Sequence, residues 1–173
     1  IRDLVSQMAD QVVQEPKDDV VLLGMHIRRK RGKEKTITIP SVPGEIIRVE
    51  DMILPALSAG GFGERVLFGV RLALEEAVIN AIKHGNELDN TKTVSVHYAM
   101  QDDRFKVTVT DEGEGFNPEE VPDPWSEEGL TAESGRGIAL MRAYMDEVEY
   151  SDKGNSVTMT KKAPWVPEDS DSS

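Results

Sequence analysis

Apolar residues along this chain alternate with polar ones in some stretches and recur at helical spacing in others. Residues 36–40 alternate between Thr and Ile, which is typical of a half-buried strand. Residues 93–100 and 105–110 alternate as well, and the short polar stretch between them predicts an antiparallel hairpin with one buried face. Residues 147–151 and 156–162 predict two further strands.

Three stretches between the predicted strands have helical periodicity. They span residues 44–59, 64–84 and 135–145, and the middle one is the longest. We expect Gly85 and Asn86 to cap its C-terminal end. A break of 23 residues, from Glu112 to Ser134, is rich in Gly, Pro and acid. Loops of this length in a compact domain are usually functional or disordered.

The chain divides into three parts. Residues 1–35 predict a short helix and a strand followed by a basic linker, which holds six of the twenty Lys and Arg residues. Residues 36–162 contain all the periodic elements described above and form the predicted domain. Residues 163–173 are rich in Pro, Ser and acid, and we expect a disordered acidic tail.

Composition narrows the class of protein. With 173 residues, 38% of them hydrophobic, the chain can bury one domain-sized core. A net charge of -12 argues against nucleic acid as a partner, and the absence of Cys excludes disulfides, thiolate metal sites and a Cys nucleophile. No apolar run approaches the roughly 20 residues of a membrane helix, so we expect a cytoplasmic protein and no membrane partner. The first residue is Ile and not Met, which suggests a piece of a longer polypeptide.

The long predicted helix carries a polar stripe. Glu76, Asn80 and His84 follow each other at intervals of four residues, with Lys83 beside them. At 100° per residue, these four side chains lie within an arc of about 100°. Such a stripe is either a solvated face or the lining of a cavity, and the helix alone leaves both interpretations open.

Two glycine-containing motifs follow. Asp111-Glu-Gly113-Glu-Gly115-Phe116 comes directly after a strand, where a fixed acid can accept a hydrogen bond from an exocyclic amine. The glycines there allow a backbone to approach a ligand closely, although the same pattern also fits a plain turn. Ser134-Gly135-Arg136-Gly137-Ile138 opens a predicted helix, and helix N-termini attract phosphate. A plain helix start with Ser134 as its N-cap is the alternative.

The order of these three features resembles the GHKL ATPase superfamily, over about residues 36–162. Within it, residues 74–85 and 135–148 are most similar to the anti-sigma-factor serine kinases of bacterial partner-switching systems. The resemblance implies an α+β fold: the two-layer Bergerat sandwich, with a mixed, mostly antiparallel sheet covered by about three helices.

The resemblance also implies roles for individual residues. Asn80 would coordinate Mg²⁺, Glu76 would act as general base toward a serine hydroxyl, and Asp111 would receive the adenine amino group. Residues 116–134 would form a lid over ATP. The remaining residues expected to bind nucleotide are Lys83, His84, Gly113, Gly115, Phe116, Ser134, Gly135, Arg136, Gly137 and Ile138.

Three positions depart from the family pattern. The family's Gly-Thr near adenine is replaced by Gly154 followed by Asn155 and Ser156, and Glu133 stands where these kinases place an arginine. The stretch 112–134 carries eight acids and no base, so a lid made from it would repel a triphosphate unless its acids point outward. Asn155 or Ser156 would have to replace the threonine beside adenine, and the resemblance supports nucleotide binding more than kinase turnover.

The function implied by the resemblance is an ATP-binding anti-sigma factor. It would phosphorylate an anti-anti-sigma antagonist and hold a sigma factor, and its relatives are often homodimers. A nucleotide-binding module without kinase turnover is an alternative. So is the catalytic domain of a sensor histidine kinase, although residues 1–35 show no histidine-bearing dimerisation helix. Residues 1–30 also weakly resemble the C-terminal end of PPM-type phosphatases, with residues 14–24 like their last strand and Asp18 in the place of a metal ligand.

Overall fold

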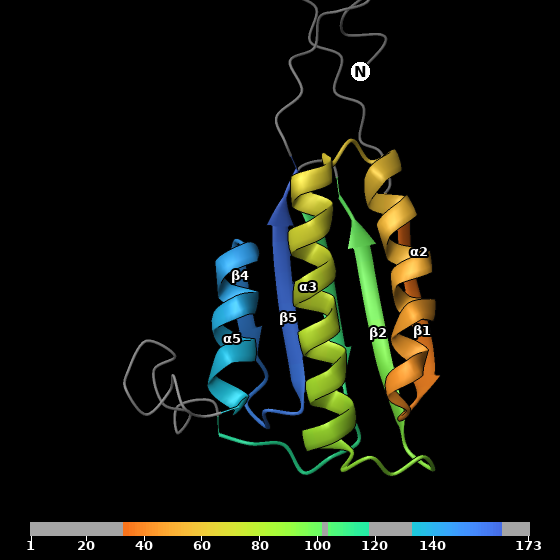
Figure 1. Cartoon of the computed structure of the whole chain (residues 1–173), viewed down its shortest axis with the longest axis vertical. Coiled ribbons are helices and arrows are strands. Elements are labelled where there is room, and N and C mark those ends of the chain that lie inside the picture. The colour runs from red at the N-terminus through yellow and green to blue at the C-terminus, as the bar shows by residue number, and fades with distance from the viewer. Residues whose placement is uncertain (1–32, 102–103, 118–132, 164–173) are drawn as a thin grey trace, which may run out of the picture.

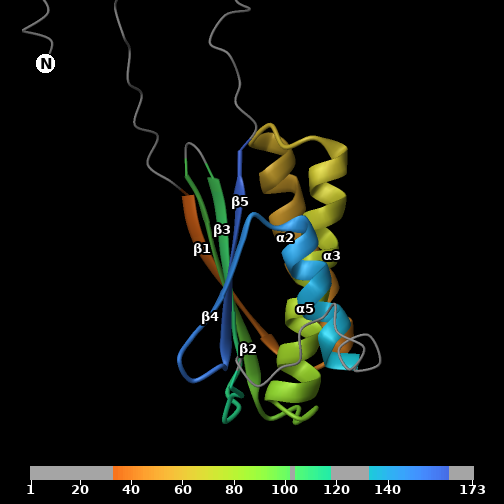
Figure 2. The same ribbon diagram turned by 90° about the vertical axis from the view of Figure 1, so that its left-hand side faces the viewer.

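The computed structural model describes residues 33–101, 104–117 and 133–163. They form a five-stranded sheet with helices on one face, as Figure 1 and Figure 2 show. The strands are β1 (Lys33–Pro40), β2 (Thr93–Met100), β3 (Arg104–Thr110), β4 (Glu147–Tyr150) and β5 (Ser156–Lys162). Their order across the sheet is β1-β2-β3-β5-β4.

All four pairings among the described strands are antiparallel, whereas we expected a mixed, mostly antiparallel sheet. The connections explain this arrangement. Two helices lie between β1 and β2, so the chain crosses the helical layer twice before it returns to the sheet. Hairpins join β2 to β3 and β4 to β5, and a hairpin connects antiparallel strands by its nature.

The helices are α2 (Ile46–Ala59), α3 (Glu64–Asn80) and α5 (Glu133–Tyr144), with a short 3₁₀ turn at Pro43–Glu45 before α2. All three cover the same face of the sheet, and α3 lies between the other two (Figure 1). The two-layer sandwich that the resemblance implied is therefore confirmed. No helix within the described residues is long and apolar enough to cross a membrane.

The core fills the space between the sheet and α3. The predicted apolar stripe of the long helix is buried there through Val70, Leu74 and Val78. Side chains from the sheet and from the flanking helices meet it, and none of these is exposed: Ile39, Ile53, Leu57, Phe105, Met141 and Met159. The opposite side of α3 carries polar side chains such as the exposed Arg71.

That C-terminal end differs from the prediction. The α-helix stops at Asn80, and residues Ala81–Gly85 form a π-helical turn, labelled η2. The left-handed residues that end it are Glu87 and Leu88, with φ of 57° and 59°, and not Gly85 or Asn86. The Leu88 N–H donates to the carbonyl of Ile82 (2.8 Å), a Schellman-type closure displaced by two residues from the expected position.

Asn86 is the C-cap of η2, as expected, with its N–H donating to the carbonyl of Ala81 (2.8 Å), and its side chain has a tertiary role as well. Its side chain is fully buried; its Nδ2 donates to the carbonyl of Thr93 (2.9 Å) and its Oδ1 accepts the N–H of Glu112 (2.8 Å). The end of the long helix is thereby joined to the start of β2 and to the loop that follows β3.

Candidate functional site

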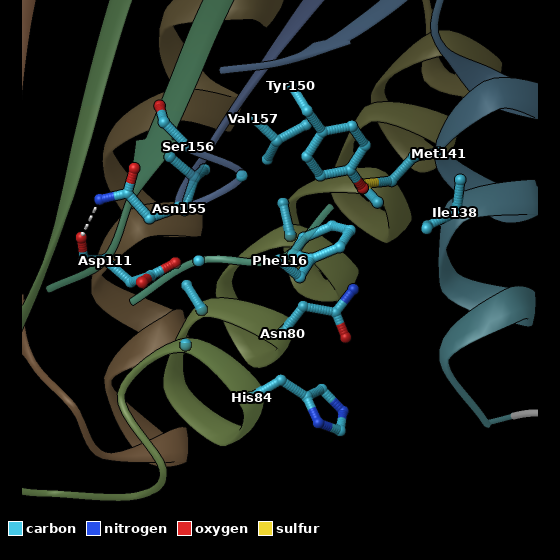
Figure 3. Close-up of a pocket in the computed structure, with 16 residues that line it drawn as sticks. Asn80, His84, Asp111, Phe116, Ile138, Met141, Tyr150, Asn155, Ser156 and Val157 are labelled. Atoms are coloured by element: carbon cyan, nitrogen blue, oxygen red, sulfur yellow. Dashed lines mark hydrogen bonds between the residues drawn. The ribbon is translucent and has the colours of Figure 1, made fainter. Parts of the chain in front are cut away.

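A cavity of about 320 Å³ lies between the C-terminal end of α3, the helix α5 and the strands β3, β5 and β4 (Figure 3). The loop after β3 closes one side of it. Six residues that the sequence singled out line the cavity: Asn80, His84, Asp111, Gly115, Phe116 and Ile138. The polar stripe of the long helix therefore does face a cavity in part.

Other predicted residues lie elsewhere. Lys83 and Arg136 are exposed and are not among the residues that line the cavity. Gly113 is buried against Gly85, whose carbonyl oxygen would overlap any Cβ at position 113. Ser134 and Gly135 lie in the first turn of α5, which starts at Glu133, so Ser134 is inside the helix and is not its N-cap.

Glu76 and Gly137 bring α3 and α5 together beside the cavity. A Cβ added to Gly137 would lie 2.6 Å from Glu76 Oε2 and 3.2 Å from Asn80 Nδ2. Only a glycine leaves room for these two side chains at the start of α5. The geometry thus places a half-buried carboxylate and an amide, one helical turn apart, against the N-terminal part of a helix.

Asp111 is fixed by its backbone at the end of β3. Its N–H donates to the carbonyl of Asn155 (3.0 Å), and its own carbonyl accepts the side-chain amide of Asn155 (3.1 Å). Its carboxylate oxygen Oδ1 accepts the N–H of Gly113 (2.8 Å), which leaves Oδ2 without a described donor. Burial raises the pKa of Asp111, and the Gly113 N–H and the Lys153 ammonium act against that shift. Gly85 provides the space, since a Cβ there would overlap this carboxyl group.

The loop after β3 interlocks with the turn between β4 and β5. Gly115 (φ +84°) and Gly154 (φ +74°) both need the left-handed region. A Cβ on Gly115 would overlap the carbonyl oxygen of Lys153, and one on Gly154 would overlap that of Phe116. Lys153 Nζ also donates to the carbonyl of Gly113 (2.9 Å). The glycines at these positions therefore allow the two loops to contact each other, in addition to any close approach of a ligand.

Asn155 and Ser156, which replace the family's Gly-Thr threonine, both line the cavity. The Asn155 amide is engaged with the Asp111 backbone. The Ser156 hydroxyl lies 2.9 Å from the hydroxyl of Thr110, and a hydroxyl can donate and accept at once. Both side chains are thus held in place beside Asp111.

The sequence analysis missed the wall opposite Asp111. Tyr150, Met141 and Val157 line it (Figure 3). The ring of Tyr150 meets Phe116 edge-on, with centroids 5.2 Å apart and an interplanar angle of 73°. Burial raises the pKa of Tyr150 to about 12. Tyr150 lies on the same face of its strand as Val148. This alternation of apolar residues was the only sequence signal for Tyr150, and it predicts a core position and not a site residue.

Few of the described residues are placed to bind a metal ion. Within the described part of the chain, no group of three His, Cys, Asp or Glu residues is placed to hold a metal ion. The side-chain amide of Asn80 faces the cavity, and no described residue hydrogen-bonds to it (Figure 3). An amide oxygen is a ligand that Mg²⁺ accepts, and Mg²⁺ commonly takes only one or two protein ligands and fills the other positions with water and phosphate.

Several expectations fall outside the described residues. These are the N-terminal remnant with Asp18, the tail from residue 164, and residues 118–132, which make up most of the expected lid and of its acids.

Comparisons with known proteins agree with the fold. A family model for the histidine kinase-like ATPase domain matches residues 39–161. The anti-sigma F factor of Clostridium perfringens is 39% identical over 101 residues, which cover 56% of this chain and 72% of that protein. The serine-protein kinase RsbW of Listeria monocytogenes is 31% identical over 135 residues, or 73% of this chain and 85% of the relative. RsbW of Bacillus licheniformis is 35% identical over 105 residues, with 53% and 62% covered.

The matched region contains every described helix, the strands β2 to β5 up to residue 161 and the end of β1, together with the residues that line the cavity. The resemblance drawn from three motifs is therefore confirmed: the chain belongs to the histidine kinase-like ATPases of the GHKL superfamily, in the branch of the anti-sigma factor serine kinases.

Proposed function

We propose that this chain binds ATP with Mg²⁺ in the cavity, phosphorylates a serine of an anti-anti-sigma protein, and holds a sigma factor when that antagonist is absent. The observation that supports this most directly is the division of the site into two ends. Asp111 lies at one end and Asn80 at the other, with Glu76 and Gly137 beside Asn80 (Figure 3).

Asp111 suits the base of the nucleotide. Its Oδ2 is free of described donors and can accept the exocyclic amine of adenine, while its backbone is held from both sides by Asn155. The apolar side chains of Val157, Met141 and Ile138 suit the faces of a flat base.

Asn80 and Glu76 suit the phosphate end. The Asn80 amide oxygen would hold Mg²⁺, which neutralises phosphate charge in phosphoryl transfer. The Glu76 carboxylate has no described ion-pair partner and would take the proton from the serine hydroxyl. The serine oxygen then forms a bond to the γ-phosphorus as the bond from that phosphorus to the ADP oxygen breaks. Backbone N–H groups in the first turn of α5 would hold the phosphates.

The partners follow from the names of the relatives, one an anti-sigma F factor and the others serine-protein kinases. We infer that a sigma factor and its antagonist bind this chain, which places its action in the cytoplasm. A homodimer, as is usual in the family, stays a prediction for a measurement of molecular mass.

Titration of the protein with Mg-ATP, followed by thermal shift, tests nucleotide binding. ATP at 100 times its Kd should stabilise the fold by about 2.7 kcal/mol. Asp111→Asn should remove most of this effect, since an amide presents an N–H as well as an oxygen where the adenine amine needs an acceptor. Equal affinity in the wild type and this variant would show that the nucleotide assignment is wrong.

A phosphotransfer assay with the antagonist separates kinase from binding module. Glu76→Gln should keep ATP affinity and abolish transfer. Glu75→Gln is the matched control, because Glu75 is the next residue on α3 and pairs with Arg71 outside the cavity. If the wild type binds ATP and transfers no phosphate, the chain is a nucleotide-binding module instead.

A further inference from the structure

Tyr150 brings to the cavity a polar group for which the described protein offers no partner. Its ring is largely buried between Phe116 and the helical layer, and its hydroxyl points toward Met141 of α5 (Figure 3). No described residue forms a hydrogen bond with that hydroxyl. Among the described residues only the Ser41 hydroxyl is buried without a partner, so the Tyr150 hydroxyl is open to the cavity, where a ligand can reach it.

The sheet register places Tyr150 across the cavity from Asp111. Tyr150 pairs with Val157, and Val157 pairs with Val109, so these three residues form one row across β4, β5 and β3. Strands lie about 4.8 Å apart, which separates the two ends of that row by about 10 Å. Asp111 lies two residues beyond Val109, on the same side of the sheet.

The hydroxyl is protonated at neutral pH, so it can donate a hydrogen bond as well as accept one. Burial raises the pKa of Tyr150 to about 12, so the hydroxyl keeps its proton. The edge-on contact with Phe116, and the contact of the Phe116 backbone with Gly154, fix the direction of the ring. Asp111 offers an acceptor on one side of the cavity, and Tyr150 a donor on the other.

We propose that Tyr150 donates a hydrogen bond to the nucleoside part of the bound nucleotide, opposite the amine held by Asp111. Asp111 and Tyr150 together then select a ligand that has a hydrogen-bond donor at one edge and an acceptor at the other. This inference rests on the proposed function, since it assumes that the cavity binds ATP. Tyr150 is thus a specificity-determining residue that the motifs of the family do not include.

Tyr150→Phe tests this proposal because it removes the hydroxyl and keeps the ring. The Kd of ATP and of adenosine should both rise roughly two- to twelvefold, the effect of losing one neutral hydrogen bond. The melting temperature of the ligand-free variant should be unchanged, because the hydroxyl that is removed has no hydrogen-bond partner among the described residues. A hydroxyl with a structural partner would instead give a lower melting temperature.

Tyr144→Phe is the matched control. Tyr144 lies on the outer side of α5 against Phe68 and does not line the cavity, so its Kd values should equal those of the wild type. Unchanged affinity of Tyr150→Phe for both ligands would overturn the proposal, and so would a loss seen with ATP and not with adenosine. If the wild type itself binds neither ligand, it is the proposed function that fails.

Discussion

Replacing Gly154 with Ala probes the contact between the loop that carries Asp111 and the turn between β4 and β5. Gly154 has φ of +74°, and a Cβ there would overlap the carbonyl oxygen of Phe116. It would also lie 2.8 Å from the Phe116 carbonyl carbon and amide nitrogen, where ordinary contacts begin at 3.4 Å. Backbone, and not a flexible side chain, would have to move.

Gly61 supplies a control with the same backbone strain and no neighbour. Its φ is +86°, and nothing lies within 4 Å of a Cβ built on it. Gly61→Ala should therefore lower the free energy of unfolding by about 1–2 kcal/mol, the cost of a left-handed alanine. Gly154→Ala adds an overpacking term of about 1–3 kcal/mol. The expected total for Gly154→Ala is about 2–5 kcal/mol.

Urea unfolding of the ligand-free proteins measures both values, with an unchanged slope as evidence of an intact two-state transition. Gly63→Ala, at a residue with ordinary φ and open surroundings, should change stability little. Gly154→Ala should also weaken ATP binding, because Phe116 and Asp111 move with the loop, whereas Gly61→Ala should not. Equal destabilisation by Gly154→Ala and Gly61→Ala would refute the close contact between the two loops.

Three further substitutions test other parts of the structure. Asn86→Ala leaves the carbonyl of Thr93 and the N–H of Glu112, both part-buried, without a side-chain partner, so urea unfolding should show a loss of about 1–3 kcal/mol. Gly137→Ala puts a Cβ 2.6 Å from Glu76 Oε2 and should displace that carboxylate; the phosphotransfer rate should fall at least about tenfold, with a smaller change in ATP affinity. Arg71→Gln removes the ion pair of the buried Glu50, whose pKa burial already raises. Without Arg71, the ionised form of Glu50 is less stable in the fold. The loss in free energy of unfolding should therefore grow as the pH rises through the pKa of Glu50, and disappear below the ordinary glutamate value of about 4.3. Urea unfolding at several pH values measures this loss.

The strands could be predicted from the sequence because they lie with one face on the core and the other in solvent. Alternation then follows directly from burial. Their ends were less predictable. β1 begins at Lys33, inside the stretch we took for a basic linker, because Lys33 and Lys35 pair with Met100 and Tyr98 of β2. Charge in a strand is tolerated where the neighbouring strand supplies the backbone hydrogen bonds, and that neighbour is sixty residues away in the chain.

The C-terminal end of the long helix shows why the site could be predicted only in part. The 100° arc placed Lys83 with Asn80 and His84, on the assumption of a regular α-helix. The π-helical turn after Asn80 is wider, and it leaves His84 at the cavity and Lys83 exposed. The hydrogen bonds of Asn86 to Thr93 and Glu112 lie at the end of this turn. They join separate elements of the fold, so no local sequence pattern predicts them.

The protein has a net charge of -12, and the proposed function requires it to bind a triphosphate, which is itself an anion. The residues lining the described cavity include the carboxylate of Asp111 and no Lys or Arg. We therefore expect Mg²⁺ on Asn80 and the N–H groups at the start of α5 to neutralise much of the phosphate charge, with Arg136 of the same helix, exposed outside the cavity lining, as a further cation near that end. Because the side chains around the base end are fixed by hydrogen bonds and by packing between loops, they discriminate between bases without attracting anions in general. Selectivity then resides at the nucleoside end, and the dependence on metal at the phosphate end.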